Sequence, residues 1–166
     1  MNKRIITFCM LAITMFSACK KNEFNGVDTS IPDVPITVSN LYGTFNGVPT
    51  VSTSVSGGGV ITITLAIPAG SGRTIKEITR VAVATTPNNY TVVEKTTGLY
   101  NPAPIAGSGT TATFTTSLAE YTSKTGLSVT TSGTATSFLA RYFLFMVTFD
   151  NGEQVFPLGV RVYVNS

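Results

Sequence analysis

The sequence predicts an all-β fold, an immunoglobulin-like or fibronectin-like antiparallel β-sandwich of about seven to nine strands. Short runs of β-branched residues alternate with clusters of turn residues, helical periodicity is nearly absent, and only 11% of the residues are charged. Strands that follow one another through short turns are typical of antiparallel sheets rather than of βαβ units. A closed β-barrel is the alternative architecture.

The clearest strand is predicted at residues 60–67, where four aliphatic residues alternate with smaller or hydroxyl-bearing ones. A period of two indicates a strand with one buried face. Residues 74–86 form a second long run whose apolar phase slips, which predicts a β-bulge or an edge position. Shorter strands are predicted at residues 36–45, 48–56, 90–94 and 110–116.

Turn and cap signals mark the breaks between these strands. Asn-Gly pairs at residues 46–47 and within residues 150–152 predict tight hairpin turns, because Asn and Gly tolerate the positive φ that such turns need. Ser117 and Glu120 have the spacing of a capping box. We therefore expect a single helical turn at residues 118–124, just before a glycine.

The last two strands are the most apolar part of the predicted domain. Residues 138–149 are apolar on both faces, which is expected of a strand covered on both sides. Residues 153–164 return after the turn with alternate valines on one face. Pro157 cannot donate a backbone hydrogen bond, so this strand is expected to have an edge or a bulge there.

The amino terminus predicts export and lipid attachment. A positive start is followed by apolar residues 5–16, a run shorter than the about 20 residues that span a bilayer. The sequence Phe-Ser-Ala-Cys at residues 16–19 resembles the lipobox of bacterial lipoproteins, although Phe16 departs from the more usual leucine. The resemblance implies a signal peptide at residues 1–18 and acylation of Cys19. The alternatives are an ordinary secretory peptide or an uncleaved anchor.

The rest of the chain is expected to form one domain behind a linker. Residues 19–35 contain two prolines, a glycine and no periodicity, so we interpret them as the acylated cysteine and a flexible linker. Residues 36–166 are the predicted β-sandwich domain. Because Cys9 lies in the signal peptide, the domain has no disulfide and depends on its core for stability.

The charge pattern argues against nucleic acid as a partner. Eleven basic residues stand against eight acidic ones, and Lys3 and Arg4 lie in the predicted signal peptide. The other basic residues are scattered rather than clustered on one face. Lys20 and Lys21 lie beside the predicted anchor, where cations favour anionic headgroups. The expected partner here is the membrane, through the acyl chains.

The residue types available make catalysis unexpected. The chain contains no histidine, and the predicted domain contains no cysteine, so the commonest general base, nucleophile partner and zinc ligands are missing. Asp150 and Glu153 flank one turn, which explains both without a catalytic role, while a calcium site at that turn stays open. We therefore predict no enzyme activity, no catalytic residues, no metal and no cofactor.

Three tyrosines are the candidate binding residues. Tyr90, Tyr100 and Tyr121 lie at strand ends or in turns, where flat rings with hydroxyls can stack on sugars or anchor a protein. The alternative, which we favour for each tyrosine taken singly, is that it covers the rim of its own core. Arg141 lies in an otherwise apolar strand, and we expect it on the solvent side.

The lipobox at Cys19, the proline-containing linker, the Thr-rich β-domain and the closing hairpin with residues 156–164 together resemble small surface lipoproteins of Bacteroidota that carry immunoglobulin-like domains. The resemblance implies glycan capture or cell-envelope assembly. The first hypothesis is a non-catalytic binding or adhesion module for a glycan or an envelope protein. The second is a structural spacer without a small ligand. Residues 21–23 partly match a surface-export signal, which favours an outer membrane lipoprotein on the cell surface over one facing the periplasm.

Overall fold

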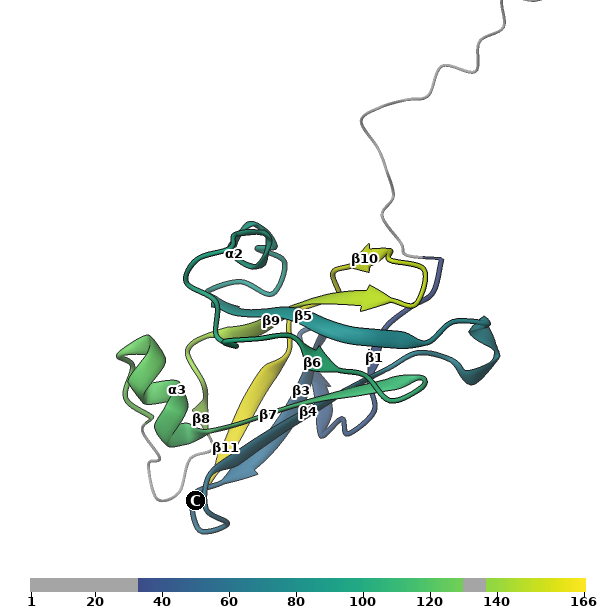
Figure 1. The fold of residues 1–166 in the computed structure, drawn as a ribbon. Helices are drawn as coiled ribbons and strands as arrows, with labels where there is room; N and C mark the ends of the chain where they lie inside the picture. The colour runs from purple at the N-terminus through teal and green to yellow at the C-terminus, as the bar shows by residue number, and fades with distance from the viewer. Residues whose placement is uncertain (1–32, 130–136) are drawn as a thin grey trace, which may run out of the picture. The chain divides into compact units, whose positions relative to one another are not determined.

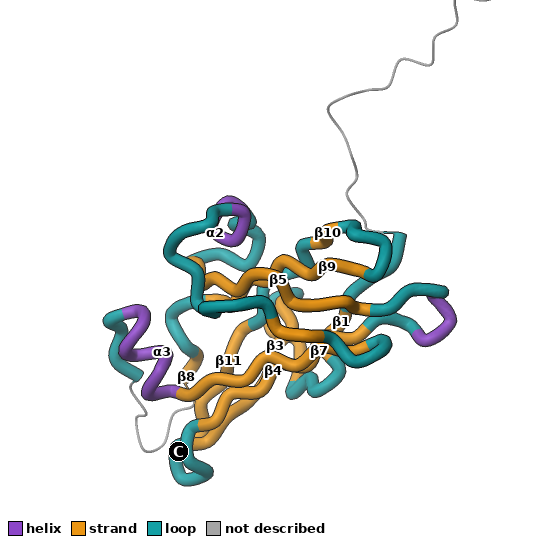
Figure 2. Tube along the Cα trace, viewed as in Figure 1, coloured by secondary structure: helices purple, strands orange, loops and turns teal. Residues whose placement is uncertain are grey.

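The computed structural model describes residues 33–129 and 137–166, which lie within one compact unit from Pro32 to Ser166. The predicted signal peptide, Cys19 and nearly all of the predicted linker lie outside the described residues. Within them the chain is mostly strand, with two short α-helices and one 3-10 turn, η2 (Ala69–Ser71), as Figures 1 and 2 show.

The strands form three sheets with linear orders. The first contains, in spatial order, β1 (Thr37–Val38), β4 (Val60–Ala66) and β7 (Thr111–Ser117). The second contains β10 (Gln154–Val155), β9 (Tyr142–Phe149), β5 (Ile75–Ala84) and β6 (Ile105–Ala106). The third contains β2 (Gly43–Phe45), β3 (Val48–Ser54), β11 (Arg161–Asn165) and β8 (Ser137–Phe138). The all-β sandwich is confirmed, and the described chain does not adopt the closed-barrel alternative.

The number of strands and the direction of one strand pair differ from the expectation, and residues 36–45 are divided between β1 and β2 in different sheets. The described residues contain eleven strands rather than seven to nine, because β1, β6, β8 and β10 are each only two residues long. In addition, β11 runs parallel to β3, with Arg161 opposite Thr50, whereas the other strand pairs are antiparallel.

One hydrophobic core is shared by the three sheets. The predicted apolar face of β4 is fully buried, which confirms its period of two. Residues from β3, β5, β7, β9 and β11 complete the cluster, so each sheet contributes one face to it. Its fully buried members include Val51, Ile61, Ile63, Leu65, Ile78, Val81, Phe143, Phe145 and Val162.

Strand β9 is buried on both faces, as its apolar sequence predicts. Phe143 and Phe145 belong to the main core, while Leu144 and Met146 form a second cluster on the opposite face. The chain between β5 and β6 covers that second face and includes the helix α2 (Thr91–Glu94). In Figure 1, α2 lies above β5 and β9.

The strand predicted at residues 90–94 is wrong, because these residues form the turn of α2. The Thr91 hydroxyl donates to Asn89 Oδ1 at 2.7 Å, and the Val93 N–H donates to the Tyr90 carbonyl at 3.0 Å. Helical spacing puts Tyr90 and Val93 on one side, where both pack on the second cluster. Burial of Val93 therefore outweighs the strand propensity of its neighbours.

The predicted bulge and tight turns are confirmed. Pairing of β5 with β9 shifts register twice between Ile75 and Arg80. At the β2–β3 turn, Asn46 and Gly47 have φ angles of 53° and 78°, and Gly152 has a φ of 87° in the turn after β9. These positive φ values explain why Asn and Gly are used there.

The strand predicted at residues 153–164 is split between two sheets. Its start pairs with β9 as β10, and its end enters the third sheet as β11. Pro157 cannot extend the first pairing. The Gly159 N–H then donates to the Pro87 carbonyl at 2.8 Å, in a contact so close that a Cβ on Gly159 would lie 2.8 Å from that oxygen. The crossing between sheets therefore requires glycine.

The helix α3 (Leu118–Thr125) follows β7 directly and confirms the predicted cap. The Glu120 N–H donates to the Ser117 hydroxyl at 3.1 Å, and Gly126 ends the helix with a φ of 69°. The helix has eight residues rather than the single turn expected, because the buried Tyr121 ties its middle to the core.

Candidate functional site

Tyr100 and Tyr121, two of the three candidate binding tyrosines, lie in the main core. Only 4% and 1% of their surfaces are exposed, and both rings pack on Phe143, with centroid separations of 5.3 and 6.0 Å. Their hydroxyls are also engaged: the Tyr100 oxygen lies 2.9 Å from the Thr116 hydroxyl, and the Arg141 N–H donates to Tyr121 at 3.1 Å. The expectation of a ligand-facing tyrosine rim is therefore corrected at these two positions.

Tyr90 lies away from the other two tyrosines. It packs on the second cluster, and its ring centroid is 5.8 Å from that of Phe156. Partial burial raises the pKa of Tyr90. The structure therefore brings Tyr100 and Tyr121 together around Phe143 but leaves Tyr90 on the opposite face of β5 and β9.

The other candidate residues are explained by local structure or lie outside the described chain. Asn151 Oδ1 accepts the Glu153 N–H at 3.1 Å, and the Asn151 amide donates to Glu153 Oε2 at 3.4 Å, so these contacts lie within the turn. Asp150 forms a partly exposed ion pair with Arg73, 3.9 Å from its Nη1. Residues 33–129 and 137–166 contain no group of three His, Cys, Asp or Glu side chains placed to hold a metal ion. Cys19 lies outside the described residues.

An exposed aromatic surface lies instead on the third sheet. Val162 and Val164 of β11 point into the core, so Arg161 and Tyr163 must point outward. The strands β2 and β8 add aromatic side chains to the same side, and their rings contact Tyr163. We call this surface the aromatic face; it consists of Tyr42, Phe45, Phe138, Arg161 and Tyr163.

The β2–β3 hairpin presents the two most exposed rings of this face. Tyr42 is 52% exposed and Phe45 is 36% exposed. A Cβ on Gly43 would lie 3.2 Å from the Phe45 ring, so this ring lies over a position that has no side chain. The Tyr42 N–H donates to the Thr50 carbonyl at 2.8 Å, which fixes the start of the hairpin.

The rings of Tyr42, Phe45 and Tyr163 are nearly parallel. Their planes differ by 9° to 20°, and their centroids are 4.9 to 6.3 Å apart. Stacked rings need about 3.5 Å between planes, so three layers would separate the outer two by about 7 Å. The measured separations are smaller, so the rings form at most two layers. Each ring therefore has one face that neither of the other two covers.

The phenols of Tyr42 and Tyr163 interact at the edge of this stack. Charge repulsion from Tyr163 raises the pKa of Tyr42, with smaller contributions from burial and from the hydrogen bond between the two side chains. Tyr42 therefore stays protonated at neutral pH. Its hydroxyl can therefore donate and accept hydrogen bonds.

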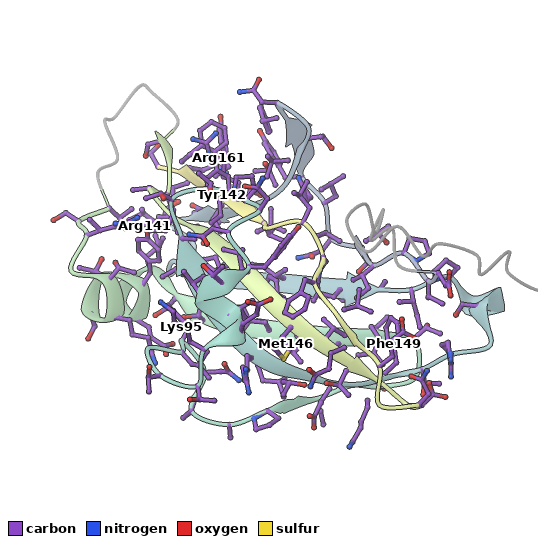
Figure 3. The ribbon with its side chains drawn as sticks, turned by 90° about the horizontal axis from the view of Figure 1, so that it is seen from above. Lys95, Arg141, Tyr142, Met146, Phe149 and Arg161 are labelled. Atoms are coloured by element: carbon purple, nitrogen blue, oxygen red, sulfur yellow. The ribbon has the colours of Figure 1, made fainter. Side chains whose placement is uncertain are left out.

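Arg161 is the positively charged member of the aromatic face. Its guanidinium carbon lies 4.0 Å from the centroid of Phe138 and 5.5 Å from that of Tyr142. Figure 3 shows Arg161 beside Tyr142, with Arg141 in the same region. The Arg161 Nε is buried without a hydrogen-bond partner. In the described parts of the chain, the ion pairs are Arg73 with Asp150 and Lys124 with Glu120, so Arg161 has no carboxylate partner.

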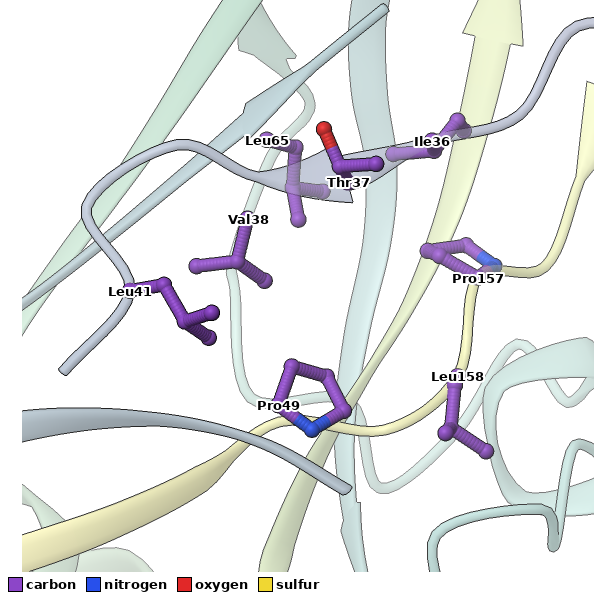
Figure 4. Close-up of a pocket in the computed structure, with 8 residues that line it drawn as sticks. All are labelled: Ile36, Thr37, Val38, Leu41, Pro49, Leu65, Pro157 and Leu158. Carbon is purple, nitrogen blue, oxygen red and sulfur yellow. The ribbon is translucent and has the colours of Figure 1, made fainter. Parts of the chain in front are cut away.

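A small apolar pocket opens between the first and third sheets (Figure 4). Its volume is about 240 Å³, and the hydroxyl of Thr37, its one polar side-chain group, donates to the Ala66 carbonyl at 3.3 Å. A site with no free polar group has little with which to orient a ligand. Its lining residues are Ile36, Thr37, Val38, Leu41, Pro49, Leu65, Pro157 and Leu158.

Two sequence signals could have located the aromatic face. Arg161 and Tyr163 occupy the outward phase of the last strand, where a solvated sheet normally has polar residues. Phe45 immediately precedes the Asn-Gly turn and Tyr42 lies three residues before Phe45, so the segment that leads into the hairpin carries both rings. The side chains of the last strand meet those of the hairpin because β3 and β11 pair in parallel. The sequence does not reveal this pairing.

In the part of the chain that the structure describes, none of the helices has the length and apolar character needed to cross a membrane. The comparisons with protein-family models, curated proteins and solved structures found no match to the chain.

Proposed function

We propose that the protein is an outer membrane lipoprotein whose β-sandwich is a non-catalytic binding module, with the aromatic face as its ligand-contact surface. The observation that carries the proposal is the set of three parallel, partly exposed rings of Tyr42, Phe45 and Tyr163. Aromatic side chains supply large contact area at low entropy cost, and exposed apolar patches mark interaction surfaces.

The composition of the chain supports a binding role. Few side chains are charged, and the lack of histidine removes the commonest general base. The lipobox-like sequence before Cys19 supports anchoring at the envelope, where burial of acyl chains contributes about 0.8 kcal/mol per CH₂. A tethered module needs only modest affinity for a polymer, because several anchored copies bind the same chain together.

The binding surface is tested with alanine variants of the full chain, purified in detergent and applied to an array of neutral and acidic polysaccharides. Tyr42→Ala and Phe45→Ala are each expected to weaken binding by about tenfold or more, since truncating a central aromatic anchor costs over 1 kcal/mol. Val60→Ala is the matched control, because Val60 is 53% exposed but lies on the first sheet. The thermal midpoints of all variants are measured alongside.

Two outcomes would contradict the proposal. Binding that survives alanine at Tyr42, Phe45 and Tyr163 together would move the ligand surface elsewhere. A wild-type chain that binds no polysaccharide on the array would favour the structural spacer.

The anchor is tested separately by Cys19→Ser. Serine cannot be acylated through a thioether, so the variant is expected to leave the membrane fraction, whereas the wild-type chain stays with it after a salt wash. The measurement is the distribution of the protein between membrane and soluble fractions. Equal retention of both proteins would contradict acylation at Cys19.

A further inference from the structure

We propose that the aromatic face recognises acidic polysaccharides, with the Arg161 guanidinium as the partner of a sugar carboxylate. This inference rests on the proposed function and adds the class of ligand. It is carried by the contacts of Arg161, a cation next to the stacked rings that has no ion-pair partner among the described residues.

Arg161 is continuous with the ring surface. Phe138 contacts the Arg161 guanidinium at 4.0 Å on one side and packs edge-on against Phe45 and Tyr163, with centroids 5.2 Å apart in both cases. A polymer that lies on the rings of Tyr42 and Phe45 therefore meets the arginine within the same surface. Along this surface each side chain contacts the next, in the sequence Tyr42, Tyr163, Phe138, Arg161 and Tyr142.

The charge of Arg161 is unbalanced in the described parts of the chain. Its contacts there are with the rings of Phe138 and Tyr142, and neither of the two ion pairs in those parts involves it. Its Nε is buried with no acceptor, although buried polar atoms in proteins nearly always have one. A bound anion would supply the missing counter-charge.

The ring contacts favour a carboxylate as that anion. At 4.0 Å the guanidinium is in van der Waals contact with the Phe138 ring, so this side of the guanidinium is covered. Arg161 as a whole is only partly buried, and a planar carboxylate matches the fork of its two terminal amino groups with two parallel hydrogen bonds.

A sugar polymer fits the rest of the surface. The exposed parts of the Tyr42 and Phe45 rings can lie against the C–H side of a pyranose ring. The phenols of Tyr42 and Tyr163 can hydrogen-bond to sugar hydroxyls. Ser52 of β3, opposite Tyr163 in the parallel pair, is exposed and adds another hydroxyl. Recognition would thus combine ring stacking with one charge contact.

The test compares polysaccharides that differ only in their charge. The full chain in detergent is titrated with polygalacturonate and with the same polymer after methyl esterification, and then with alginate, hyaluronan and dextran. We expect binding to at least one of the three carboxylated polymers, and, for polygalacturonate, at least tenfold weaker binding after esterification. Because the contact is ionic, the preference for the acid form should shrink as sodium chloride is raised.

Variants of Arg161 assign the preference to this residue. Arg161→Gln should lower affinity for the acid polymer about tenfold and lower affinity for the ester by a much smaller factor. Arg161→Lys keeps the charge without the planar fork and should give an intermediate loss, which also keeps the test valid if the glutamine variant does not fold. Arg73→Gln is the matched control, because it removes an equal charge from a residue that lies outside the aromatic face and pairs with Asp150. This variant should bind as the wild type does.

Several results would overturn the inference. These are equal binding of the acid and ester polymers, equal loss on both polymers in Arg161→Gln, and absence of binding to all three carboxylated polymers. Failure of the inference alone can be told apart from failure of the proposed function. If dextran binds and Tyr42→Ala abolishes that binding, the aromatic face is the binding surface but its acidic specificity is wrong.

Discussion

At the scale of single residues, burial decides what each tyrosine can do. Six tyrosines are spread through the chain, and sequence position alone placed three of them in loops or at strand ends. Tyr100 and Tyr121 fill the core beside Phe143, whereas Tyr42 and Tyr163 pair on the outer surface. Position along the chain predicts a turn, but it does not predict on which side of the sheet a turn residue folds back.

The buried tyrosines predict a loss of stability in alkali. Burial is the largest cause that raises the pKa of Tyr100 and Tyr121. The hydrogen bond between Tyr100 and Thr116 and the one from the Arg141 backbone to Tyr121 act in the opposite direction. The folded chain then keeps two phenolic protons that the unfolded chain releases near its ordinary pKa of about 10. Stability is therefore unaffected below about pH 10 and falls as the pH rises above it.

The measurement is the urea midpoint between pH 8 and 11 for the wild type and for the double variant Tyr100→Phe, Tyr121→Phe. The variant is expected to be less stable at pH 8, because each lost hydrogen bond contributes about 1 kcal/mol. Its decline above pH 10 should be shallower. Parallel curves for the two proteins would mean that these phenols do not titrate differently on unfolding.

At the scale of elements, local patterns predicted most strands but not their exceptions. The period of two in β4, the two apolar faces of β9, the bulge in β5 and the cap of α3 all depend on neighbours in the sequence, and all were predicted. The helix α2 was not predicted, because its conformation depends on burying Val93 against β9. The division of the last strand into β10 and β11 depends on the distant contact between Gly159 and Pro87.

A close approach between elements gives an element-scale prediction. The Gly107 N–H donates to the Lys76 carbonyl at 2.8 Å, and a Cβ on Gly107 would overlap the Ile75 carbonyl oxygen. Gly107→Ala should therefore push β6 away from β5 and lower the free energy of unfolding by about 1–3 kcal/mol. Urea denaturation measures this change.

Gly70→Ala is the matched control, because a Cβ at Gly70 would meet no heavy atom within 4 Å and the residue has no positive φ. It should be neutral or slightly stabilising, since alanine restricts the unfolded chain. Equal stability of Gly107→Ala and Gly70→Ala would contradict the close approach of β6 to β5.

At the scale of the whole molecule, the sequence predicted the class of fold but not its functional surface. Composition and alternation indicate an all-β domain, because they report which side of each strand is buried. The aromatic face joins residues 42–45 to residues 138 and 161–163 through strands far apart in the chain. Such a surface depends on the order of strands in the third sheet, and a single sequence carries little information about that order.

Contact between the aromatic face and its ligand can be observed by hydroxyl-radical footprinting of the full chain with and without saturating polygalacturonate. We expect protection at Tyr42, Phe45 and Tyr163, together with unchanged labelling of Tyr90 on the second cluster. Protection confined to the first sheet around Val60, with the rings labelled equally in both states, would show that the ligand binds elsewhere.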